Sequence, residues 1–349
     1  MIPAARIAAV IDLLSEAPEG VPAGQVLRRG LQRRRYAGSG DRQAISALFW
    51  SVHRHVARLG WQLEQKGYAP TPRALVLAAL PLVEGLPADD VSALFGGDSR
   101  HASEALDDEE CALVAAFDGQ SVDDDAMPRA VRLEWPEELL ADVDAALGPD
   151  SDDELAAMQG EAATDIRINP LKVNHRRVVR DKLAGRGIKC HPTRLSPLGI
   201  RLVRRTRTEN LPEFRSGLFE IQDEGSQLAA LLCDARPGMQ VADICAGAAG
   251  KSLVMAAAME NRGRIVALDT DAGRLERGGT RIRRAGIHNI ERVAVSGDWG
   301  TKRYRGKFDR VVIDAPCSGS GTWRRQVDVR WRTDAATMAR LHDAQASLL

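Results

Sequence analysis

The chain has 349 residues, with 48 Lys and Arg against 48 Asp and Glu, and 44% of its side chains are hydrophobic. This length suggests two or three domains, and the apolar content excludes a disordered chain. The longest apolar run, residues 74–83, is too short to cross a bilayer, and no secretory signal is visible. The five cysteines form no C-x-x-C pair, so we expect reduced thiols in a cytoplasmic protein, with neither a disulfide framework nor a metal site.

The zero net charge conceals strongly charged blocks. Residues 84–165 carry 3 basic and 24 acidic side chains, whereas residues 166–215 carry 14 basic and 3 acidic ones. Such asymmetry is typical of a polyanion-binding segment beside a solvating one, although a single charge run is more often a solvated surface. Arginine supplies 11 of the 14 basic residues in the second block, and its guanidinium suits phosphate contacts and stacking on bases.

Residues 1 to about 95 have the apolar spacing of helices. The pattern predicts helices at 4–14 and 73–83, and Asp41 is placed to N-cap a long amphipathic helix that reaches Leu59. The arginine cluster at 28–35 is expected in or beside a glycine-containing loop. Residues 96–128 are acidic and are expected to form a linker or a weakly packed segment. Two more helices are expected after them, at 136–147 and 152–159.

From residue 164 onward, strands and helices alternate. A small α+β unit is predicted from strands at 165–170 and 200–203 around a helix at 178–184. Beyond residue 219, alternation predicts parallel βαβ units, with strands at 240–245, 264–268, 290–295 and 308–313 and helices at 251–259 and 272–284. Ligands of such sheets bind beyond the carboxyl ends of the strands. At or near such ends lie Asp243, Asp269, Asp298 and Asp314.

The first chemical motif is the turn Asp243–Lys251, D-I-C-A-G-A-A-G-K. Small residues let a ligand approach the backbone, and the following helix offers free N–H groups. The turn lacks the glycine spacing of dinucleotide folds and of phosphate loops, so it indicates either nucleotide-type binding or a tight strand–helix turn. Asp269, after the next strand, can accept hydrogen bonds from ribose hydroxyls or cap a helix.

The second motif is Asp314–Gly321, D-A-P-C-S-G-S-G, which places a carboxylate and a thiol at a strand end. A buried cysteine is usually inert, but Cys317 lies on a Pro/Gly loop at the ligand edge and is a candidate for reaction. The next residues, 322–332, contain tryptophan and arginine, which can stack on an unpaired base.

In their combined order and spacing, these motifs resemble those of the RsmB/Sun (Fmu, NOL/NOP-type) RNA cytosine-5 methyltransferases, which use S-adenosylmethionine. The resemblance covers residues about 165–349, and the matching stretches are Phe219–Gln227, Asp243–Lys251, Ser296–Asp298, Asp314–Gly321 and Arg324–Arg325. Residues 1–95 resemble the helical NusB-type RNA-binding extension of some members. The block 166–215 is similar to the family's small RNA-binding insertion.

The resemblance implies a fold class and a domain order. We expect an α/β, Rossmann-like class I methyltransferase domain at 216–349, incomplete at its C-terminal end. A small basic α+β RNA-binding unit at 161–215 precedes it, and an all-α NusB-like domain with an acidic linker occupies 1–160.

The resemblance also implies site residues. The residues that would wrap the methionine part of the cofactor are Cys245, Ala246, Gly247, Ala248, Ala249, Gly250 and Lys251. Asp269 would hold the ribose, Asp298 would lie near the adenine, and Asp314 would contact the base and the cofactor edge. Cys317 would be the thiol that assists product release. The turn has Ala249 where the family usually has glycine, which matters if that backbone needs a positive φ.

The family's attacking thiol lies in a later T-C-S motif, and residues 1–349 contain no such motif. Together with an apolar strand at a sheet edge and a last helix without a capping glycine, this predicts a truncated chain that does not methylate RNA unaided. The leading prediction is an RNA methyltransferase acting on carbon 5 of a cytosine in structured RNA (rRNA or tRNA), as a monomer. The alternatives are a catalytically inactive RNA-binding protein of the same fold and a methyltransferase for a small molecule or a protein.

Overall fold

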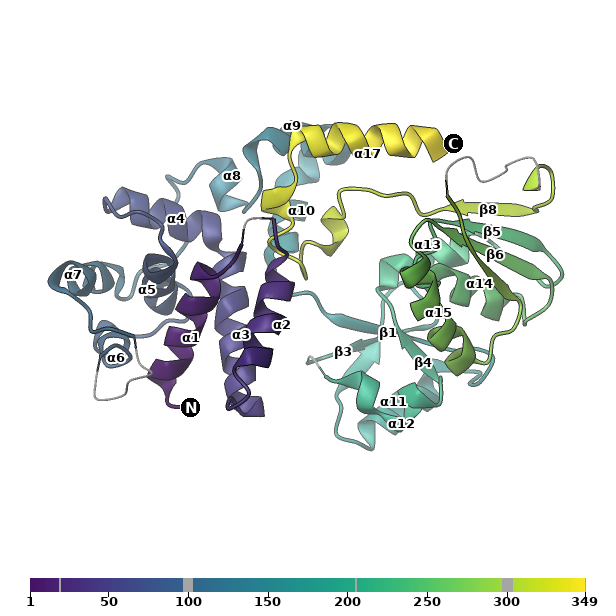
Figure 1. Cartoon of the computed structure of the whole chain (residues 1–349), viewed down its shortest axis with the longest axis horizontal. Coiled ribbons are helices and arrows are strands. Elements are labelled where there is room, and N and C mark those ends of the chain that lie inside the picture. Colours follow the sequence, from purple (N-terminus) through teal and green to yellow (C-terminus); the bar gives the residue numbers. More distant parts are fainter. Residues whose placement is uncertain (19, 97–102, 205, 297–303, 349) are drawn as a thin grey trace. The chain divides into compact units, whose positions relative to one another are not determined.

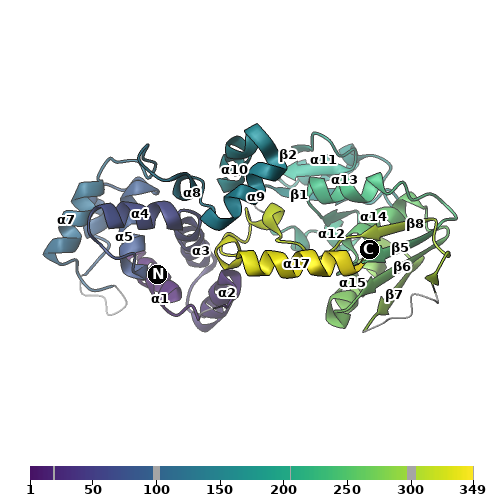
Figure 2. The same ribbon diagram turned by 90° about the horizontal axis from the view of Figure 1, so that it is seen from above.

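The computed structural model describes residues 1–18, 20–96, 103–204, 206–296 and 304–348. The chain divides into two compact units (Figures 1 and 2). The helical unit comprises Met1–Glu161 and Ser318–Arg340, and the sheet unit comprises Ala162–Cys317 and the residues from Leu341. Residues 162–215 and most of 216–349 therefore fall in one unit, whereas residues 318–340 group with the helices. In the described part of the chain, no helix is long and apolar enough to cross a membrane.

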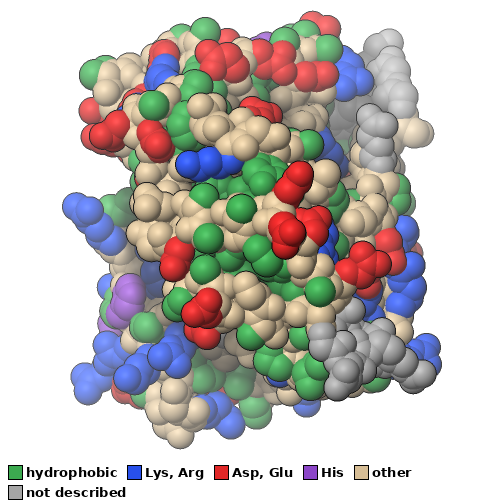
Figure 3. Space-filling model, turned by 90° about the vertical axis from the view of Figure 1, so that its left-hand side faces the viewer, with side chains coloured by type: hydrophobic (Ala, Val, Ile, Leu, Met, Phe, Trp, Pro, Cys, Tyr) green, Lys and Arg blue, Asp and Glu red, His purple; other side chains and the backbone are tan. Residues whose placement is uncertain are grey.

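The helical unit begins with helices that share one apolar core. They are α1 (Pro3–Ser15), α2 (Ala23–Arg33), α3 (Ser39–Arg54), α4 (Val56–Gln65), α5 (Pro72–Leu82), α6 (Ala88–Ser92) and α7 (Asp108–Phe117). Next come α8 (Arg129–Arg132), α9 (Leu140–Leu147) and α10 (Ser151–Gln159), with short 3-10 turns at Glu137–Leu139 and Gly148–Asp150. Leu13, Phe49, Leu63 and Leu77 are fully buried in the core. This confirms the helical N-terminal region. In Figure 3, acidic side chains gather along the upper margin of the face shown.

The long helix predicted after Asp41 is two helices, and Asp41 is not its N-cap. Asp41 lies inside the first turn of α3, where its carboxylate accepts the Gly38 N–H (3.0 Å). The helix breaks at His55 because the buried Glu134 carboxylate accepts the N–H groups of residues 57 and 58, both at 3.0 Å, and so starts α4 anew. Glu134 lies far along the chain, so no local pattern marks this break.

Two further expectations for this unit need correction. Arg28, Arg29 and Arg33 lie on helix α2, because one face of this segment packs Val26 and Leu27 into the core, whereas Arg34 and Arg35 lie in the loop that follows the helix. The acidic stretch 96–128 is not simply a linker. It contains α7, and three apolar side chains of α7 are buried in the core, namely Leu113, Val114 and Phe117.

The sheet unit starts with an antiparallel sheet of order β2-β3-β1-β4. Its elements are β1 (Thr164–Ile168), α11 (Arg176–Ala184), β2 (Cys190–Pro192), β3 (Gly199–Leu202), a 3-10 turn (Thr208–Asn210), α12 (Pro212–Arg215) and β4 (Phe219–Ile221). Ile166 of β1 lies opposite Ile200 of β3 and Ile221 of β4. The apolar face of α11 packs on this sheet through Val179 and Leu183. These elements confirm the predicted small α+β unit.

A parallel sheet of order β7-β6-β5-β8 follows. Its elements are α13 (Glu224–Leu232), β5 (Gln240–Ile244), α14 (Gly250–Ala258), β6 (Arg264–Asp269), α15 (Ala272–Ala285), β7 (Ile290–Ala294) and β8 (Arg310–Ile313). Helices α14 and α15 cover one face of the sheet (Figures 1 and 2), as successive crossovers of one hand require. Strand β8 is an outer strand among the described residues, and Val311 on it is 54% exposed. The predicted parallel α/β domain is confirmed.

After the D-A-P-C loop the chain enters the helical unit again. This segment contains 3-10 turns at Ser320–Thr322 and Arg330–Arg332, followed by α17 (Ala335–Leu348). Trp323 is 1% exposed, and its ring lies 4.5 Å from that of Trp135. Asp328 accepts the N–H of Ala23 (2.9 Å) at the start of α2. The expectation that Trp323 stacks on an RNA base is therefore wrong, because its ring is used in the core.

Candidate active site

The predicted cofactor turn connects β5 to α14 in a strained conformation. Three of its residues have left-handed backbones, Cys245 (φ 63°), Gly247 (φ 56°) and Ala249 (φ 62°). Glycine adopts such angles freely, but each of the two other residues costs about 1–2 kcal/mol there. Strain of this kind persists only where the surroundings hold it, so the neighbours of the turn decide its shape.

The end of β6 holds the front of the turn. The N–H of Ala246 donates to the carbonyl of Leu268 (2.9 Å), and the N–H of Gly247 donates to Oδ2 of Asp269 (2.7 Å). Asp269 is buried, and its Oδ1 accepts the N–H of Asp271 (2.8 Å). The structure thus brings the predicted ribose-binding carboxylate directly against the predicted methionine-binding turn.

A second carboxylate lies beneath the turn. Asp243 is fully buried; its Oδ2 accepts the hydroxyl of Ser252 (2.5 Å) in the first turn of α14, and its Oδ1 has no hydrogen-bond partner within the described residues. Burial raises the pKa of Asp243 to about 6, although the Ser252 hydrogen bond opposes that rise. Burial, followed by the negative charge of Asp269, also raises the pKa of the half-buried Cys245 thiol.

The D-A-P-C loop meets the turn through an ion pair. The N–H of Asp314 continues the strand pairing to Ile244 (3.1 Å), and its carboxylate lies 2.6 Å from Nζ of Lys251. Asp314 is half-exposed, and Cys317 further along the loop is exposed. Asp314 and Cys317 therefore lie in the loop after β8, at the sheet edge where the sequence predicts a ligand. Asp298 lies outside the described residues.

Four further residues shape the turn. Arg281 donates from Nη1 to the carbonyl of Ala248 (3.0 Å), and Gln222 donates from Nε2 to the carbonyl of Gly250 (3.3 Å). Glu220 holds Arg281, and Gly278 brings α15 close to the turn. Sequence reasoning did not assign a role to any of these four. The sequence does contain one local signal for close packing of α15, which is the pair of adjacent glycines at 278 and 279 inside a helical pattern.

The arrangement fits a nucleoside cofactor with an amino-acid tail. Free N–H groups at the start of α14 and a turn of small residues suit the tail, and Asp269 suits ribose hydroxyls. At Gly247 a Cβ atom would lie 2.9 Å from the Arg274 guanidinium, so a larger residue would fill the cradle. Among the described residues, no group of three or more His, Cys, Asp or Glu side chains is placed to hold a metal ion.

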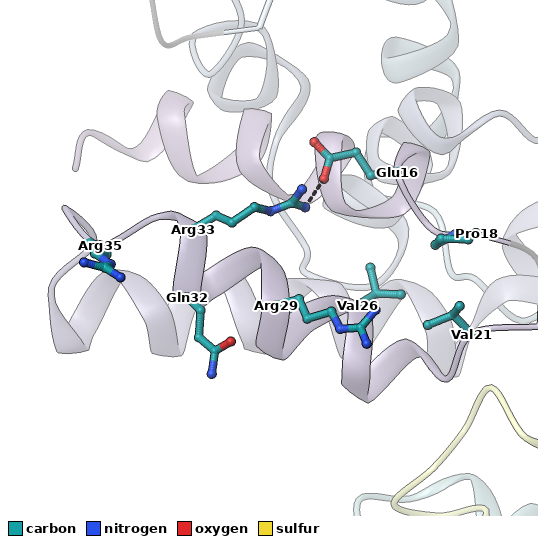
Figure 4. A pocket seen from close by; sticks show the side chains of 8 residues that line it. All are labelled: Glu16, Pro18, Val21, Val26, Arg29, Gln32, Arg33 and Arg35. Carbon is teal, nitrogen blue, oxygen red and sulfur yellow. Dashed lines mark hydrogen bonds and ion pairs between the residues drawn. The ribbon is translucent and has the colours of Figure 1, made fainter.

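A separate groove lies in the helical unit, along α2. Its volume is about 740 Å³, and its lining includes Arg29, Gln32, Arg33 and Arg35 (Figure 4). Arg33 forms an ion pair with Glu16, which leaves Arg29 and Arg35 as the other cationic side chains that line the groove. Arginine side chains along a groove suit an anionic ligand.

The sheet order, the small-residue turn after β5 and the carboxylate after β6 define an α/β methyltransferase domain. The family model described as 16S rRNA methyltransferase RsmB/F matches residues 230–349 of this chain. A probable ribosomal RNA small subunit methyltransferase B of Synechocystis sp. is 35% identical over 189 residues, which cover 53% of this chain and 42% of that protein. The chain thus spans less than half the length of this curated relative.

Two solved structures extend the comparison. A methyltransferase homolog protein from Pyrococcus horikoshii is 30% identical, with a TM-score of 0.50, over 57% of this chain and 65% of that one. The crystal structure of PH0851 has a TM-score of 0.71 and covers 99% of this chain and 81% of that one. Its sequence identity is 20%, so this second likeness shows the fold alone.

Proposed function

We propose that this protein is an RNA methyltransferase that transfers a methyl group from S-adenosylmethionine to carbon 5 of a cytosine in structured RNA. The observation that carries the proposal is the meeting of the cofactor turn, Asp269 and the D-A-P-C loop at one sheet edge. The match of residues 230–349 to an rRNA methyltransferase family supports ribosomal RNA as the substrate class.

Bound S-adenosylmethionine would supply an activated methyl group. The N–H groups of the turn and of α14 would bind the methionine end, and Asp269 would accept hydrogen bonds from the ribose. The ion pair with Lys251 would keep Asp314 at the edge shared by cofactor and base. Cys317, exposed on the same loop, would act on the base during product release.

The RNA itself would be held by basic side chains away from the reacting base. Exposed basic residues of the small α+β unit include Arg177, Lys182, Lys189, Arg194 and Arg204. We propose that they contact phosphates, which supply affinity without sequence information. The arginine-lined groove along α2 would give a second phosphate contact.

The test combines titration calorimetry with S-adenosylmethionine, an RNA-binding assay with 16S rRNA fragments, and transfer of a labelled methyl group. Asp269→Ala should weaken cofactor binding about tenfold to a hundredfold, because it removes a buried charged acceptor. Glu276→Ala is the matched control, since it removes an exposed carboxylate from α15.

The outcomes separate the candidate functions. Binding of both ligands with methyl transfer supports the proposal, and it would contradict the expectation that residues 1–349 do not methylate RNA unaided. Binding of both without transfer favours an inactive RNA-binding protein of this fold. Cofactor binding without RNA binding favours a methyltransferase for a small molecule or a protein.

A further inference from the structure

Two side chains from outside the cofactor turn (Asp243–Lys251) form hydrogen bonds to its last residues. The carbonyl of Ala248 accepts from Arg281 (3.0 Å), and the carbonyl of Gly250 accepts from Gln222 (3.3 Å). These two carbonyls flank Ala249, one of the left-handed residues of the turn. One hydrogen bond therefore holds the peptide unit directly before the strained residue, and the other holds the second peptide unit after it.

Arg281 is itself fixed by a buried carboxylate. Its Nε donates to Oε2 of Glu220 (2.8 Å), and the other oxygen of Glu220 pairs with Arg284. The Glu220 side chain is 6% exposed and lies on β4 of the antiparallel sheet. Charge-assisted hydrogen bonds of this kind fix the plane of a guanidinium, so the Nη1 atom that meets the turn has a defined position.

Gln222 has a comparable support. Its Oε1 accepts from Nε of the buried Arg167 (2.7 Å) on β1, so its amide nitrogen is directed to Gly250 and to Ser226 (3.2 Å). Burial lowers the pKa of Arg167 to about 10, which leaves its guanidinium charged at neutral pH. Both supports of the turn thus begin on the antiparallel sheet.

Helix α15 is pressed against the same carbonyl. A Cβ atom at Gly278 would lie 3.2 Å from the carbonyl carbon of Ala248 and 3.4 Å from the Cβ of Ala249. Arg281 follows three residues later, on the same side of the helix. Close contact leaves little freedom for this guanidinium, so it is held over the turn.

We propose that Arg281 and Glu220 are positioning residues for the cofactor. Arg281 holds the turn in the shape that binds the methionine end of S-adenosylmethionine, and Glu220 acts through Arg281. The inference rests on the proposed cofactor function and adds two residues outside the turn to it. Neither side chain needs to touch the cofactor.

The experiment compares two ligands on the full chain. S-adenosylhomocysteine carries the amino-acid end, whereas 5′-methylthioadenosine lacks it. In Arg281→Ala the Kd for S-adenosylhomocysteine should rise about tenfold, while that for 5′-methylthioadenosine should change less than about twofold. Arg281→Lys keeps one donor that can reach Ala248 and should lie between wild type and Arg281→Ala.

The matched control is Arg283→Ala, which removes the same charge from the same helix. Arg283 is exposed and bonds only weakly to Thr280 (3.3 Å), so both affinities should stay unchanged. Melting of each variant without ligand separates loss of fold from loss of affinity. If Arg281→Ala does not fold, Arg281→Lys and Glu220→Gln carry the same two-ligand comparison.

Specific outcomes would overturn the proposal. Equal loss of affinity for the two ligands, or an equal loss in Arg283→Ala, would show a general effect on stability or charge. Glu220→Gln should weaken binding alone but not in the Arg281→Ala background, and additive effects would refute action through Arg281. If the wild type binds neither ligand, the proposed function fails as well. If the wild type binds the ligands and Arg281→Ala leaves both Kd values unchanged, only this inference fails.

Discussion

Ala249 shows how one residue type changes the energetics of a turn. Its backbone is left-handed (φ 62°) and its methyl group is fully buried. The left-handed angle costs an alanine about 1–2 kcal/mol, whereas a buried methyl contributes about 0.8 kcal/mol and a less flexible unfolded chain adds about 0.4–1 kcal/mol. The penalty and the two gains are therefore nearly equal.

We expect Ala249→Gly to change the free energy of unfolding by less than about 1 kcal/mol. Ala256→Gly, at a fully buried position with a right-handed backbone inside α14, should cost about 1.5–2 kcal/mol. Hydrogen exchange of the amides of β5 and α14 measures both. Similar losses in the two variants would mean that the angle at Ala249 carries no strain.

Asp243 predicts a pH dependence of stability. Its pKa is raised from 3.8 to about 6 in the folded protein, so between these values the folded state binds more protons than the unfolded state. Stability should therefore fall as pH rises from about 4 to about 6, by about 2–3 kcal/mol. Asp243→Asn keeps an acceptor for Ser252, and its stability should not decrease over this pH range. Hydrogen exchange of the β5 amides at pH 4.5 and 7.5 measures the difference. An unchanged difference between the two pH values would contradict the assignment.

At the scale of elements, α15 connects the two sheets to the cofactor turn. Its Gly278 touches the turn, and Arg281 joins the turn to β4. At its C-terminal end, the carbonyls of Arg284 and Ala285 accept from Lys172 (2.7 Å) and Asn169 (2.8 Å), which follow β1. The C-terminal end of α15 is thus hydrogen-bonded to the small basic α+β unit, and the middle of the helix contacts the turn.

Gly278→Ala should therefore weaken S-adenosylmethionine binding. Alanine favours a helix by up to about 1 kcal/mol, but here its Cβ would lie 3.2 Å from the Ala248 carbonyl carbon and displace the turn. Gly225→Ala in α13 is the control, because no atom of the described residues outside its own helix backbone lies within 4 Å of the added Cβ. This variant should stabilise the protein without changing affinity. Titration calorimetry of the two variants checks this. Unchanged affinity in Gly278→Ala would contradict the close packing.

At the scale of the whole molecule, residues 318–340 belong to the helical unit although they directly follow the D-A-P-C loop. Four side chains of this segment are buried, namely those of Trp323, Val327, Arg330 and Thr333. Arg330 donates to the carbonyl of Glu134 (2.7 Å), the residue whose carboxylate starts α4. The chain that leaves the candidate site is therefore part of the helical core.

Trp323→Ala should destabilise the helical unit by about 3–5 kcal/mol, because a fully buried indole ring is removed. Trp331→Ala, which removes a ring that is 38% exposed, should cost less than about 1 kcal/mol. Urea unfolding followed by far-ultraviolet circular dichroism measures both. If Trp323→Ala kept its stability and lost only RNA affinity, that result would support stacking of Trp323 on an RNA base.

Much of this fold could be predicted because its signals are local. Alternating apolar runs and helical periods predicted the parallel sheet, and the position of each aspartate after a strand predicted that Asp269 and Asp314 would reach one edge. Sequence motifs alone also indicated the methyltransferase family. These features depend on residues within one turn or one strand, so they are visible without the fold.

Contacts between distant segments were decided only by the tertiary structure. Glu220 and Arg281 are 61 positions apart, and no periodicity marks their ion pair or its hydrogen bond to Ala248. The same holds for the helix break at His55, which Glu134 imposes, and for the burial of Trp323 against Trp135. The left-handed angle of Ala249 belongs to this group as well, because only packing from β6, α15 and Gln222 can hold an alanine in that conformation.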